Sequence, residues 1–290
     1  MDETTRNLIR MALEEDHVSE DFTTLWSIPE EMEGQARLLA KQSGVFCTGP
    51  LFAAVFQALD PKTEVRLLVE EGAQLQAGDI AAEVVGSARV LLEAERTALN
   101  LVSHLSGIAT LTSQFVEAVQ GTRARICDTR KTTPLWRKWD KYAVVHGGGE
   151  NHRMDLSDQI LLKDNHIRLS PTISAAYLSV KEKNLKSLPI EVEVDTLDQL
   201  EELLEVGVER VLLDNMSPET LRKAVAISAG RTVLEASGGV NLDTVGAIAE
   251  TGVDFISVGA LTHSVTGFDF SLEIEMDFDD HLDKPNHRVM

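Results

Sequence analysis

The sequence is short of several features, and each shortage excludes a class of protein. It has only two cysteines, Cys47 and Cys127, among 290 residues, which is too few for a disulfide framework or a zinc site and indicates a reducing compartment. No run approaches the roughly 18 uninterrupted apolar residues that a membrane helix needs. The opening segment, MDETTRNLIRMALEED, lacks the basic and apolar regions of a secretory signal. We therefore expect a cytoplasmic protein with no membrane partner.

Positive charge is also scarce. The chain has 27 Lys and Arg against 47 Asp and Glu, a formal net charge of −20. This balance argues against nucleic acid as a partner, because nucleic-acid-binding proteins carry a basic footprint. The segment from Arg123 to Arg168 reverses the sign, with ten Lys and Arg against six Asp and Glu, a net +4. Such a segment is either a solvated surface or the lining of a pocket for a strongly anionic small molecule.

The second half of the sequence repeats a pattern of strand and helix. Six apolar, β-branched runs begin at Ala124, Gln159, Ile190, Val211, Val233 and Phe255, and the last four start 21 or 22 residues apart. The segments between them have leucines at helical spacing, as in TLDQLEELLEVG. Near-continuous apolar strands alternating with helices predict a parallel sheet covered by helices. Such units form an α/β barrel or a doubly wound sheet.

The first hundred residues have a different, α+β pattern. GVFCTGPLFAAVFQAL, from Gly44, predicts a helix, and glycines at positions 72, 78 and 86 separate short alternating strands. A long helix is expected from Glu95 to Val119. FDFSLEIEMDF, from Phe268, alternates like a strand and is expected to return to the first part. We predict an N-terminal α/β domain over residues 1–108, joined by the tail 268–290, and an α/β barrel over residues 109–267.

Polar residues recur at or just after the ends of the six predicted strands. They are Arg130, Lys131, Lys163, Glu193, Asp214, Ser237, Gly238, Gly239 and Gly259. Because the carboxyl ends of barrel strands form the active-site face, this recurrence favours a pocket over a solvated surface. His152 and Arg153 come shortly before the strand that ends at Lys163. The three glycines before them, residues 147–149, could turn their backbone N–H groups toward an anion or form an ordinary loop.

Cations gathered at one rim need anionic partners, because burying an unpaired charge costs several kcal/mol. Asp128, Asp158 and Asp164 could supply some of that charge, and an anionic ligand the rest. Charged hydrogen bonds of roughly 1.5–3 kcal/mol each would hold a dicarboxylate or a phosphate. Three strand acids, Glu191, Glu193 and Asp214, could hold Mg²⁺ bound to a diphosphate, accept hydrogen bonds from a sugar, or neutralise the cations.

On these motifs the chain resembles the quinolinate phosphoribosyltransferase family. The matching segments span nearly the whole chain and include EDHVSEDFTT, ERTALN, DTRKTTP, GGGENHR, LLKDNHI, EVEVD, LLDN, EASGG and VGALTHS. The resemblance implies an N-terminal α/β sandwich, a C-terminal α/β barrel of fewer than eight strands, and a homodimer that is a hexamer in some members. It implies that quinolinate reacts with 5-phosphoribosyl 1-diphosphate and Mg²⁺ to give nicotinate mononucleotide, diphosphate and CO₂ for NAD biosynthesis.

The resemblance also assigns roles to individual residues. Carboxylates and phosphates of the substrates would be bound by Thr129, Arg130, Lys131, His152, Arg153 and Lys163, with Arg96 reaching in from the other subunit. Glu193 and Asp214 would face the ribose and Mg²⁺ and would act in catalysis with Lys131 and Lys163. The 5-phosphate would be held by Ser237, Gly238, Gly239, Val258, Gly259, Ala260 and His263. After TRKTTP the chain has Leu135-Trp136, where the family commonly has a glycine.

Two other functions remain as alternatives. Barrels often carry a Schiff-base lysine, so Lys131 or Lys163 could serve an aldolase. A group of proteins linked to molybdenum transport shares the fold, and a member of it would bind an oxyanion or a nucleotide without turnover. Intact LLKDNH and LTHS segments, both present in this chain, are not expected in that group.

Overall fold

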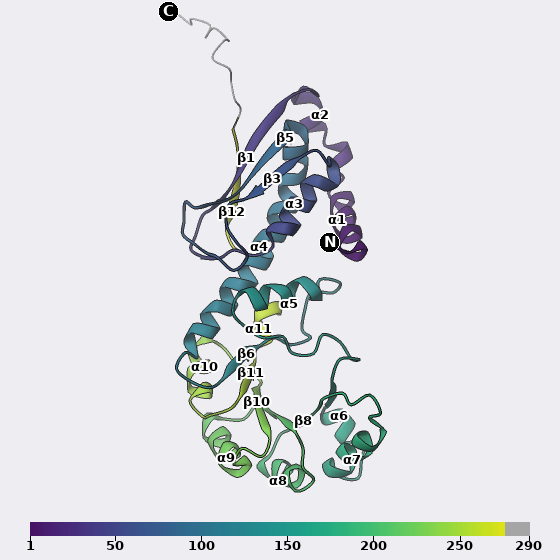
Figure 1. Cartoon of the computed structure of the whole chain (residues 1–290), viewed down its shortest axis with the longest axis vertical. Helices are drawn as coiled ribbons and strands as arrows, with labels where there is room; N and C mark the ends of the chain where they lie inside the picture. The colour runs from purple at the N-terminus through teal and green to yellow at the C-terminus, as the bar shows by residue number, and fades with distance from the viewer. Residues whose placement is uncertain (276–290) are drawn as a thin grey trace, which may run out of the picture. The chain divides into compact units, whose positions relative to one another are not determined.

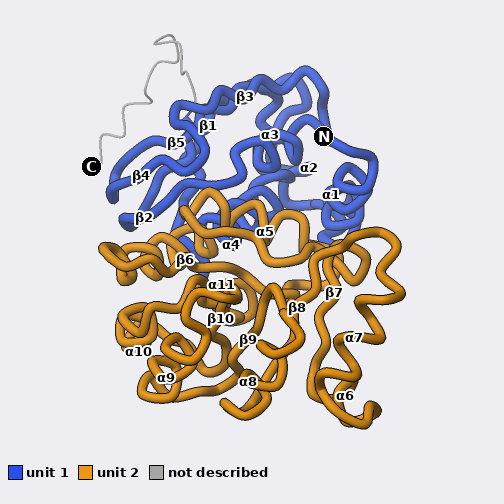
Figure 2. Tube along the Cα trace, turned by 60° about the horizontal axis from the view of Figure 1, so that its bottom comes forward, with its two compact units in different colours: residues 1–106, 267–290 blue, residues 107–266 orange. Residues whose placement is uncertain are grey.

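The computed structural model describes residues 1–275, which form two compact units. Unit 1 contains residues 1–106 and the chain from residue 267 onward, and unit 2 contains residues 107–266 (Figure 2). The long helix α4 (Ala88–Ala118) begins in unit 1 and ends in unit 2. It starts earlier than the expected Glu95, because the preceding residues continue the apolar face with Leu91 and Ala94 buried. Residues 276–290 of the predicted tail lie outside the described part.

Unit 1 is built on a four-stranded antiparallel sheet with a small two-stranded sheet beside it. The order in the larger sheet is β12-β1-β5-β3. Its strands are β1 (Glu33–Ala40), β3 (Glu64–Leu67), β5 (Ile80–Ser87) and β12 (Phe270–Glu275), and the smaller sheet pairs β2 (Gly44–Val45) with β4 (Gln74–Leu75). In β1, Ala36, Leu38 and Ala40 are buried and alternate with more exposed residues, as expected for a sheet covered on one face. The strand expected after Phe268 pairs with β1.

Helices of unit 1 lie on one side of this sheet (Figure 1). They are α1 (Glu3–Glu15), the short 3₁₀ helix η1 (Val18–Glu20), α2 (Phe22–Ser27) and α3 (Gly49–Leu59). Ile9 and Leu13, one turn apart on α1, are buried in this layer. The α3 helix begins where Glu71 accepts hydrogen bonds from the backbone N–H groups of Thr48 and Gly49, both at 2.7 Å. These contacts satisfy two of the N–H groups that a helix start leaves without partners.

Unit 2 contains the parallel sheet that the repeat predicts. The six expected runs form β6 (Arg125–Cys127), β7 (Ile160–Leu162), β8 (Ile190–Val194), β9 (Arg210–Asp214), β10 (Val233–Ser237) and β11 (Phe255–Ser257). They pair in parallel in the order β6-β11-β10-β9-β8-β7. The prediction of an α/β barrel with fewer than eight strands is confirmed.

The helices of unit 2 follow the strands and surround the sheet (Figure 1). They are α5 (Arg137–His146), α6 (Asp164–Ile167), α7 (Ile173–Lys183), α8 (Leu197–Glu205), α9 (Pro218–Ser228), α10 (Leu242–Ala249) and α11 (Ala260–His263). Side chains of Thr196, Ser217 and Asn241 accept backbone N–H groups at the starts of α8, α9 and α10. These N-cap residues begin each helix shortly after the preceding strand ends. Because the strands are parallel, their carboxyl ends lie at one rim of the sheet.

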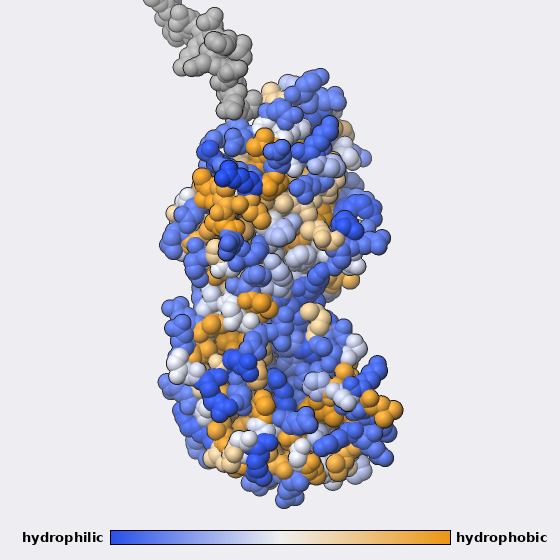
Figure 3. Space-filling view, viewed as in Figure 1, coloured by the Kyte–Doolittle hydropathy of each residue, from blue (hydrophilic) through white to orange (hydrophobic). Residues whose placement is uncertain are grey.

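The surface carries hydrophobic residues in separate groups among hydrophilic ones, as the face in Figure 3 shows. The large aliphatic and aromatic side chains are mainly inside, with Phe46, Phe52 and Val211 fully buried. Within residues 1–275, every helix is too short or too polar to traverse a lipid bilayer.

Candidate active site

A pocket of about 790 Å³ in unit 2 gathers most of the predicted site residues. The predicted residues in its lining are Thr129, Arg130, Lys131, His152, Arg153, Lys163, Glu193, Asp214, Ser237, Gly238, Gly239, Gly259, Ala260 and His263. They come from the ends of several parallel strands, which is why residues far apart in sequence meet here. The lining also includes Leu161, Leu212, Asn215, Glu235, Val240 and Ser257, to which the sequence analysis gave no role.

Two predicted site residues lie elsewhere. Val258 is fully buried, and its N–H donates to the carbonyl of Cys127 at 2.9 Å, so it supports the chain at Gly259 rather than lining the pocket. Arg96 is exposed on the part of α4 that belongs to unit 1 and is not in the pocket lining. Unit 1 has a larger groove, about 1270 Å³, between α1 and α3, and no predicted site residue lines it.

The pocket cations are only partly neutralised by the protein. Lys163 Nζ lies 3.2 Å from Glu193 Oε2. Arg130, Lys131 and Arg153 form no ion pair within residues 1–275, and Arg130 Nε is buried without a hydrogen-bond partner in that part of the chain. Burial and the neighbouring charge of Arg130 lower the pKa of Arg153. The pocket thus has positive charge left for a ligand.

The three aspartates offered as internal partners of these cations are engaged by other groups. Asp128 is fully buried and pairs with the buried ammonium of Lys141. Asp158 accepts the N–H of Met154 at 2.8 Å, and Asp164 lies 3.9 Å from Arg168. The expectation that these three aspartates offset the rim cations is therefore wrong. Each is held by a group close to it in the fold, and among the acids of residues 1–275 only Glu193 forms an ion pair with a rim cation.

Lys131 is held against the turn at Gly259 by close packing. A Cβ on Gly259 would lie 3.0 Å from Lys131 Cδ and 3.1 Å from His263 Nε2, so the absent side chain leaves room for both. Thr262 Oγ1 donates to the carbonyl of Lys131 at 2.7 Å. The Lys131 N–H in turn donates to Thr129 Oγ1 at 3.0 Å. Together these contacts fix the Lys131 backbone beside Gly259.

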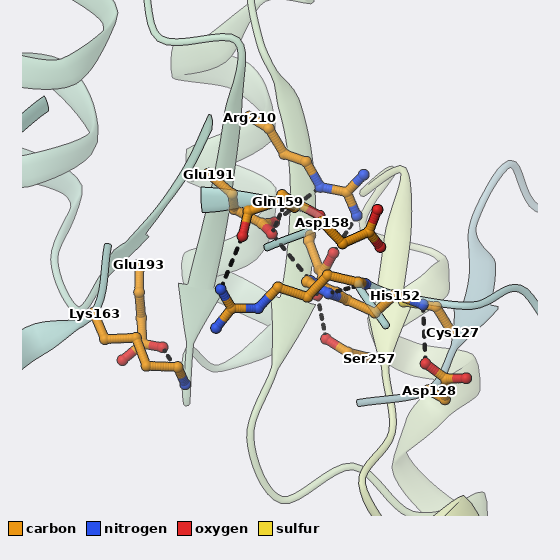
Figure 4. Close-up of polar contacts among 12 residues, drawn as sticks. Cys127, Asp128, His152, Asp158, Gln159, Lys163, Glu191, Glu193, Arg210 and Ser257 are labelled. Carbon is orange, nitrogen blue, oxygen red and sulfur yellow. Dashed lines mark hydrogen bonds and ion pairs between the residues drawn. The ribbon is translucent and has the colours of Figure 1, made fainter. Parts of the chain in front are cut away.

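A buried charged network adjoins the pocket, shares His152, Glu235 and Ser257 with its lining, and was largely missed by the sequence analysis (Figure 4). Arg210 Nε donates to Glu191 Oε1 at 2.9 Å, and Arg210 Nη2 pairs with Glu235. Glu235 also accepts the hydroxyl proton of Ser257, and His152 Nε2 lies 3.0 Å from Glu191 Oε2. A charged residue inside an apolar strand, such as Glu235, was the available signal, but its partners are distant in sequence.

The pKa values of the two glutamates in this network are shifted in opposite directions. Burial would raise the pKa of Glu191, but the hydrogen bond from His152 and the charge of Arg210 outweigh it and lower the pKa. Burial and the nearby Glu191 charge raise the pKa of Glu235. Burial lowers the pKa of Arg210, but the two carboxylates more than reverse this. For Glu191, the alternative that strand acids neutralise cations is correct, because its partner is Arg210.

The open pocket and the buried network differ in whether their carboxylates are available to bind a metal ion. His152, Glu191 and Glu235 place ligand atoms within 4.8 Å of one another, but the Arg210 guanidinium bonds to both carboxylates and supplies the cation there. Glu193 and Asp214 instead line the open pocket with oxygen donors. Mg²⁺ is usually bound by one or two carboxylates together with substrate phosphates. The donor set of Glu193 and Asp214 fits that ion.

The three glycines at 147–149 do not present their N–H groups to an anion. Those groups donate to the carbonyls of Ala143, Val145 and Val144 and close the end of α5. A Cβ on Gly147 would lie 2.4 Å from the carbonyl oxygen of Ala109. The glycines are therefore explained by a helix end packed tightly on α4, and the anion-binding alternative is wrong.

Leu135, where the family commonly has glycine, adopts a backbone conformation that favours glycine. Leu135 has φ +68°, the left-handed region that favours glycine, and its side chain is exposed. The loop therefore keeps a conformation suited to glycine although this chain has leucine there. Trp136 is the residue before α5, and its N–H donates to Thr133 at 3.0 Å.

Family models match both units of the chain. The model "Quinolinate phosphoribosyl transferase, C-terminal domain" matches residues 108–273, and the corresponding N-terminal domain model matches residues 21–106. The chain is 42% identical over 278 residues to nicotinate-nucleotide pyrophosphorylase (carboxylating) of Mycobacterium leprae, covering 94% of this chain and 98% of that protein. It is 39% identical over 253 residues to the probable nicotinate-nucleotide pyrophosphorylase (carboxylating) of Bacillus subtilis, covering 87% of this chain and 88% of that protein.

Solved structures show the same similarity. The nicotinate-nucleotide pyrophosphorylase from Francisella tularensis matches with a TM-score of 0.90 at 36% identity, covering 94% of this chain and 96% of that one. NadC from Streptococcus pyogenes matches with a TM-score of 0.89 at 39% identity, covering 93% of this chain and 95% of that one. The likeness extends over both units.

Proposed function

The chain belongs to the quinolinate phosphoribosyltransferase family, and on that premise we propose that its unit 2 pocket joins quinolinate to 5-phosphoribosyl 1-diphosphate. The products are nicotinate mononucleotide, diphosphate and CO₂, a step of NAD biosynthesis. Both substrates carry several negative charges. The observation that carries the assignment is a set of pocket cations in an otherwise acidic chain that form no ion pair within residues 1–275: Arg130, Lys131 and Arg153. Electrostatic attraction by this set concentrates anionic substrates at the rim.

The pocket offers separate places for the two substrates. Arg130 and Arg153 provide planar guanidinium groups, which suit bidentate contacts to the quinolinate carboxylates. A second part of the lining, at the ends of β10 and β11, suits the 5-phosphate, because backbone N–H groups bind phosphate well. This part contains Ser237, Gly238, Gly239 and Gly259. Lys131 and Lys163 add compact charges to the same lining. Leu161 and Leu212 give the lining an apolar part that fits the pyridine ring.

The chemistry needs charge stabilisation more than proton transfer. The quinolinate ring nitrogen uses its lone pair to form a bond to ribose C1 as the bond from C1 to diphosphate breaks. The ribosyl centre gains positive charge, which Glu193 and Asp214 can stabilise from the pocket wall. Loss of the 2-carboxylate as CO₂ then leaves an electron pair on carbon that the adjoining cationic nitrogen disperses, before a proton replaces it. We assign the catalytic part to Lys131, Lys163, Glu193 and Asp214.

We further propose that Glu193 and Asp214 hold Mg²⁺ together with the substrate diphosphate. The ion supplies positive charge that favours diphosphate as a leaving group. Glu193 is the pocket acid that also contacts Lys163, and Asp214 accepts an N–H from Asn215 at 2.7 Å. Both carboxylates are thereby oriented by the protein before any substrate binds.

We also propose a homodimer in which Arg96 enters the pocket of the neighbouring subunit. A hexamer, as in some family members, is the larger assembly that such dimers could form. Arg96 is exposed and absent from the pocket of its own chain, and a third guanidinium would suit a dicarboxylate. The cytoplasm is the compartment that fits two buried, unpaired cysteines.

A direct assay tests the function. The purified chain is mixed with quinolinate, 5-phosphoribosyl 1-diphosphate and Mg²⁺, and CO₂ release and ultraviolet absorbance are followed. We expect turnover that Lys163→Ala and Arg153→Ala reduce by at least about a hundredfold in kcat/KM while the fold is retained. Lys186→Ala, which removes an exposed lysine, is the control and should match the unchanged chain. Tight oxyanion binding with no turnover would overturn the proposal and favour the binding function instead.

A further inference from the structure

The imidazole ring of His152 has both nitrogens engaged by the protein. The backbone N–H of Arg153 points at Nδ1 over 2.7 Å. Nε2 lies 3.0 Å from Glu191 Oε2 and 3.5 Å from Glu235 Oε1. A backbone N–H can only donate, so Nδ1 must accept, and the proton of the neutral ring then sits on Nε2, facing the two carboxylates.

We propose that His152 is a positioning residue in this neutral form and does not bind the substrate anions as a cation. It would act through Arg153, the residue that contacts the substrate. This inference rests on the proposed function for the identity of the substrate. It departs from the substrate-binding role that the family resemblance implies for His152, because neither ring nitrogen is free for a ligand.

Glu191 holds Arg153 at two points. The first runs from Glu191 through the His152 ring to the Arg153 backbone N–H. The second connection runs through Gln159. Its side-chain amide donates to Glu191 Oε2 at 2.9 Å, and its backbone carbonyl accepts a hydrogen bond from Arg153 Nη1 at 3.0 Å. Figure 4 shows His152 and Gln159 both beside Glu191, with Lys163 and Glu193 set apart from them. One buried carboxylate thus fixes both the backbone and the guanidinium of a rim arginine.

Arg210 keeps that carboxylate in place. It donates to Glu191 from Nε and to Glu235 from Nη2, and its guanidinium carbon lies 4.3 Å from the centre of the Phe255 ring. Glu191 and Glu235 are both completely buried. A buried side chain with several hydrogen bonds has little conformational freedom, so the Glu191 carboxylate keeps a fixed position beside the pocket.

A cationic His152 would break this arrangement. A proton on Nδ1 would face the N–H of Arg153, two donors within 2.7 Å, and the hydrogen bond would be lost. The ring would have to turn, which would also remove its contact with Glu191. The protein therefore favours the neutral ring by geometry, and the pocket's positive charge comes from arginine and lysine.

The tautomer can be measured directly in the free protein. The full chain is labelled with ¹⁵N-histidine, and the ring nitrogens are observed by NMR at neutral pH, with and without quinolinate. The His152→Gln variant assigns the signal among the eight histidines. We expect Nδ1 unprotonated and Nε2 protonated in both states. Protonation of Nδ1 in either state would overturn the proposal. Because this measurement needs no turnover, its failure is distinct from failure of the proposed function.

A double-mutant cycle tests the route through Arg153. kcat/KM for quinolinate is measured for His152→Phe, Arg153→Ala and the double variant. If His152 acts through Arg153, the double variant should be no worse than Arg153→Ala by more than about threefold, although His152→Phe alone lowers kcat/KM at least about tenfold. Effects that multiply would show that His152 contacts the substrate independently. If His152→Phe fails to fold, the NMR result on the unchanged chain decides.

Discussion

The side chain of Asn215 occupies the space that a side chain on Gly238 would need. A Cβ built on Gly238 would lie 2.2 Å from Asn215 Oδ1 and 2.9 Å from the Asn215 backbone nitrogen. The Asn215 N–H also donates to the carbonyl of Ser237 at 2.8 Å, and its amide donates to Asp214 Oδ2. The end of β9 and the turn after β10 are therefore interlocked, joining Asp214 to the Ser237–Gly238 part of the pocket lining.

Replacing Gly238 should disrupt this interlock. Gly238→Ala meets both the contact with Asn215 and an unfavourable φ of +97°. We expect kcat/KM for the phosphoribosyl substrate to fall at least about tenfold. Gly230→Ala is the matched control, because Gly230 has φ +75° but open space around its missing Cβ. It should lose about 1–2 kcal/mol of stability through strain and keep its kcat/KM. Equal losses of activity in both variants would contradict the interlock.

Mixing two inactive chains tests whether pockets are shared between subunits. Arg96→Ala and Lys163→Ala remove groups that lie in different units of one chain. In a mixed dimer one pocket would receive an intact Arg96 from the partner and keep an intact Lys163. We expect activity to recover toward about a quarter of normal by random pairing. Mixtures no more active than the separate variants would show that each pocket is completed within its own chain.

The buried pair of Asp128 and Lys141 should give a pH-dependent stability. Both side chains are fully buried, and burial raises the pKa of Asp128 to about 6 despite the attraction of Lys141. Lys141→Met removes that attraction, so the folded state would hold its proton on Asp128 to still higher pH. The unfolded chain releases it near about pH 4. Because the folded state then binds more protons, stability falls as pH rises.

Urea unfolding at about pH 5 and about pH 8 measures this effect. We expect Lys141→Met to be destabilised at the higher pH by about 3–5 kcal/mol, the usual cost of breaking a buried pair, and by clearly less at the lower pH. Lys186→Met, at an exposed position, should change little at either pH. A loss for Lys141→Met that is the same at both pH values would mean that Asp128 is not left charged and unpaired.

Leu135 should be a site where glycine stabilises the protein. Its φ of +68° costs about 1–2 kcal/mol for a residue with a Cβ, and glycine recovers that at an entropic cost of about 0.5–1 kcal/mol. Leu135→Gly should therefore raise the free energy of unfolding by up to about 1.5 kcal/mol. Leu156→Gly is the control, since Leu156 is equally exposed but is not among the residues with positive φ. It should be neutral or destabilising, and the opposite order would argue against strain at Leu135.

Much of the fold follows from patterns along the chain. Strands such as β8 and β9 are short apolar runs bounded by helix starts, so each could be predicted from its own residues. The gathering of Lys163 and Asp214 at one rim followed from the rule that parallel strands share a carboxyl-end face. The family was identified correctly because its motifs recur in the same order along nearly the whole chain.

What the sequence did not reveal depends on contacts between distant residues. Arg210 gave no signal of its partners, since Glu191 and Glu235 lie on the two neighbouring strands and pair with it only in the folded sheet. The glycine run before Glu150 had two readings, and only the position of α4 against Gly147 decides between them. Such features are set by packing across the fold.

The pairing of β12 with β1 has a consequence for how the chain is made. The first strand of the larger sheet in unit 1 must wait for residues 270–275, its neighbours in register from Gln35↔Glu275 to Ala40↔Phe270. Until residues 270–275 have been synthesised, one edge of β1 has no permanent neighbour, and unpaired strand edges promote association between chains. In newly synthesised unit 1, this strand edge is a site that a chaperone would protect.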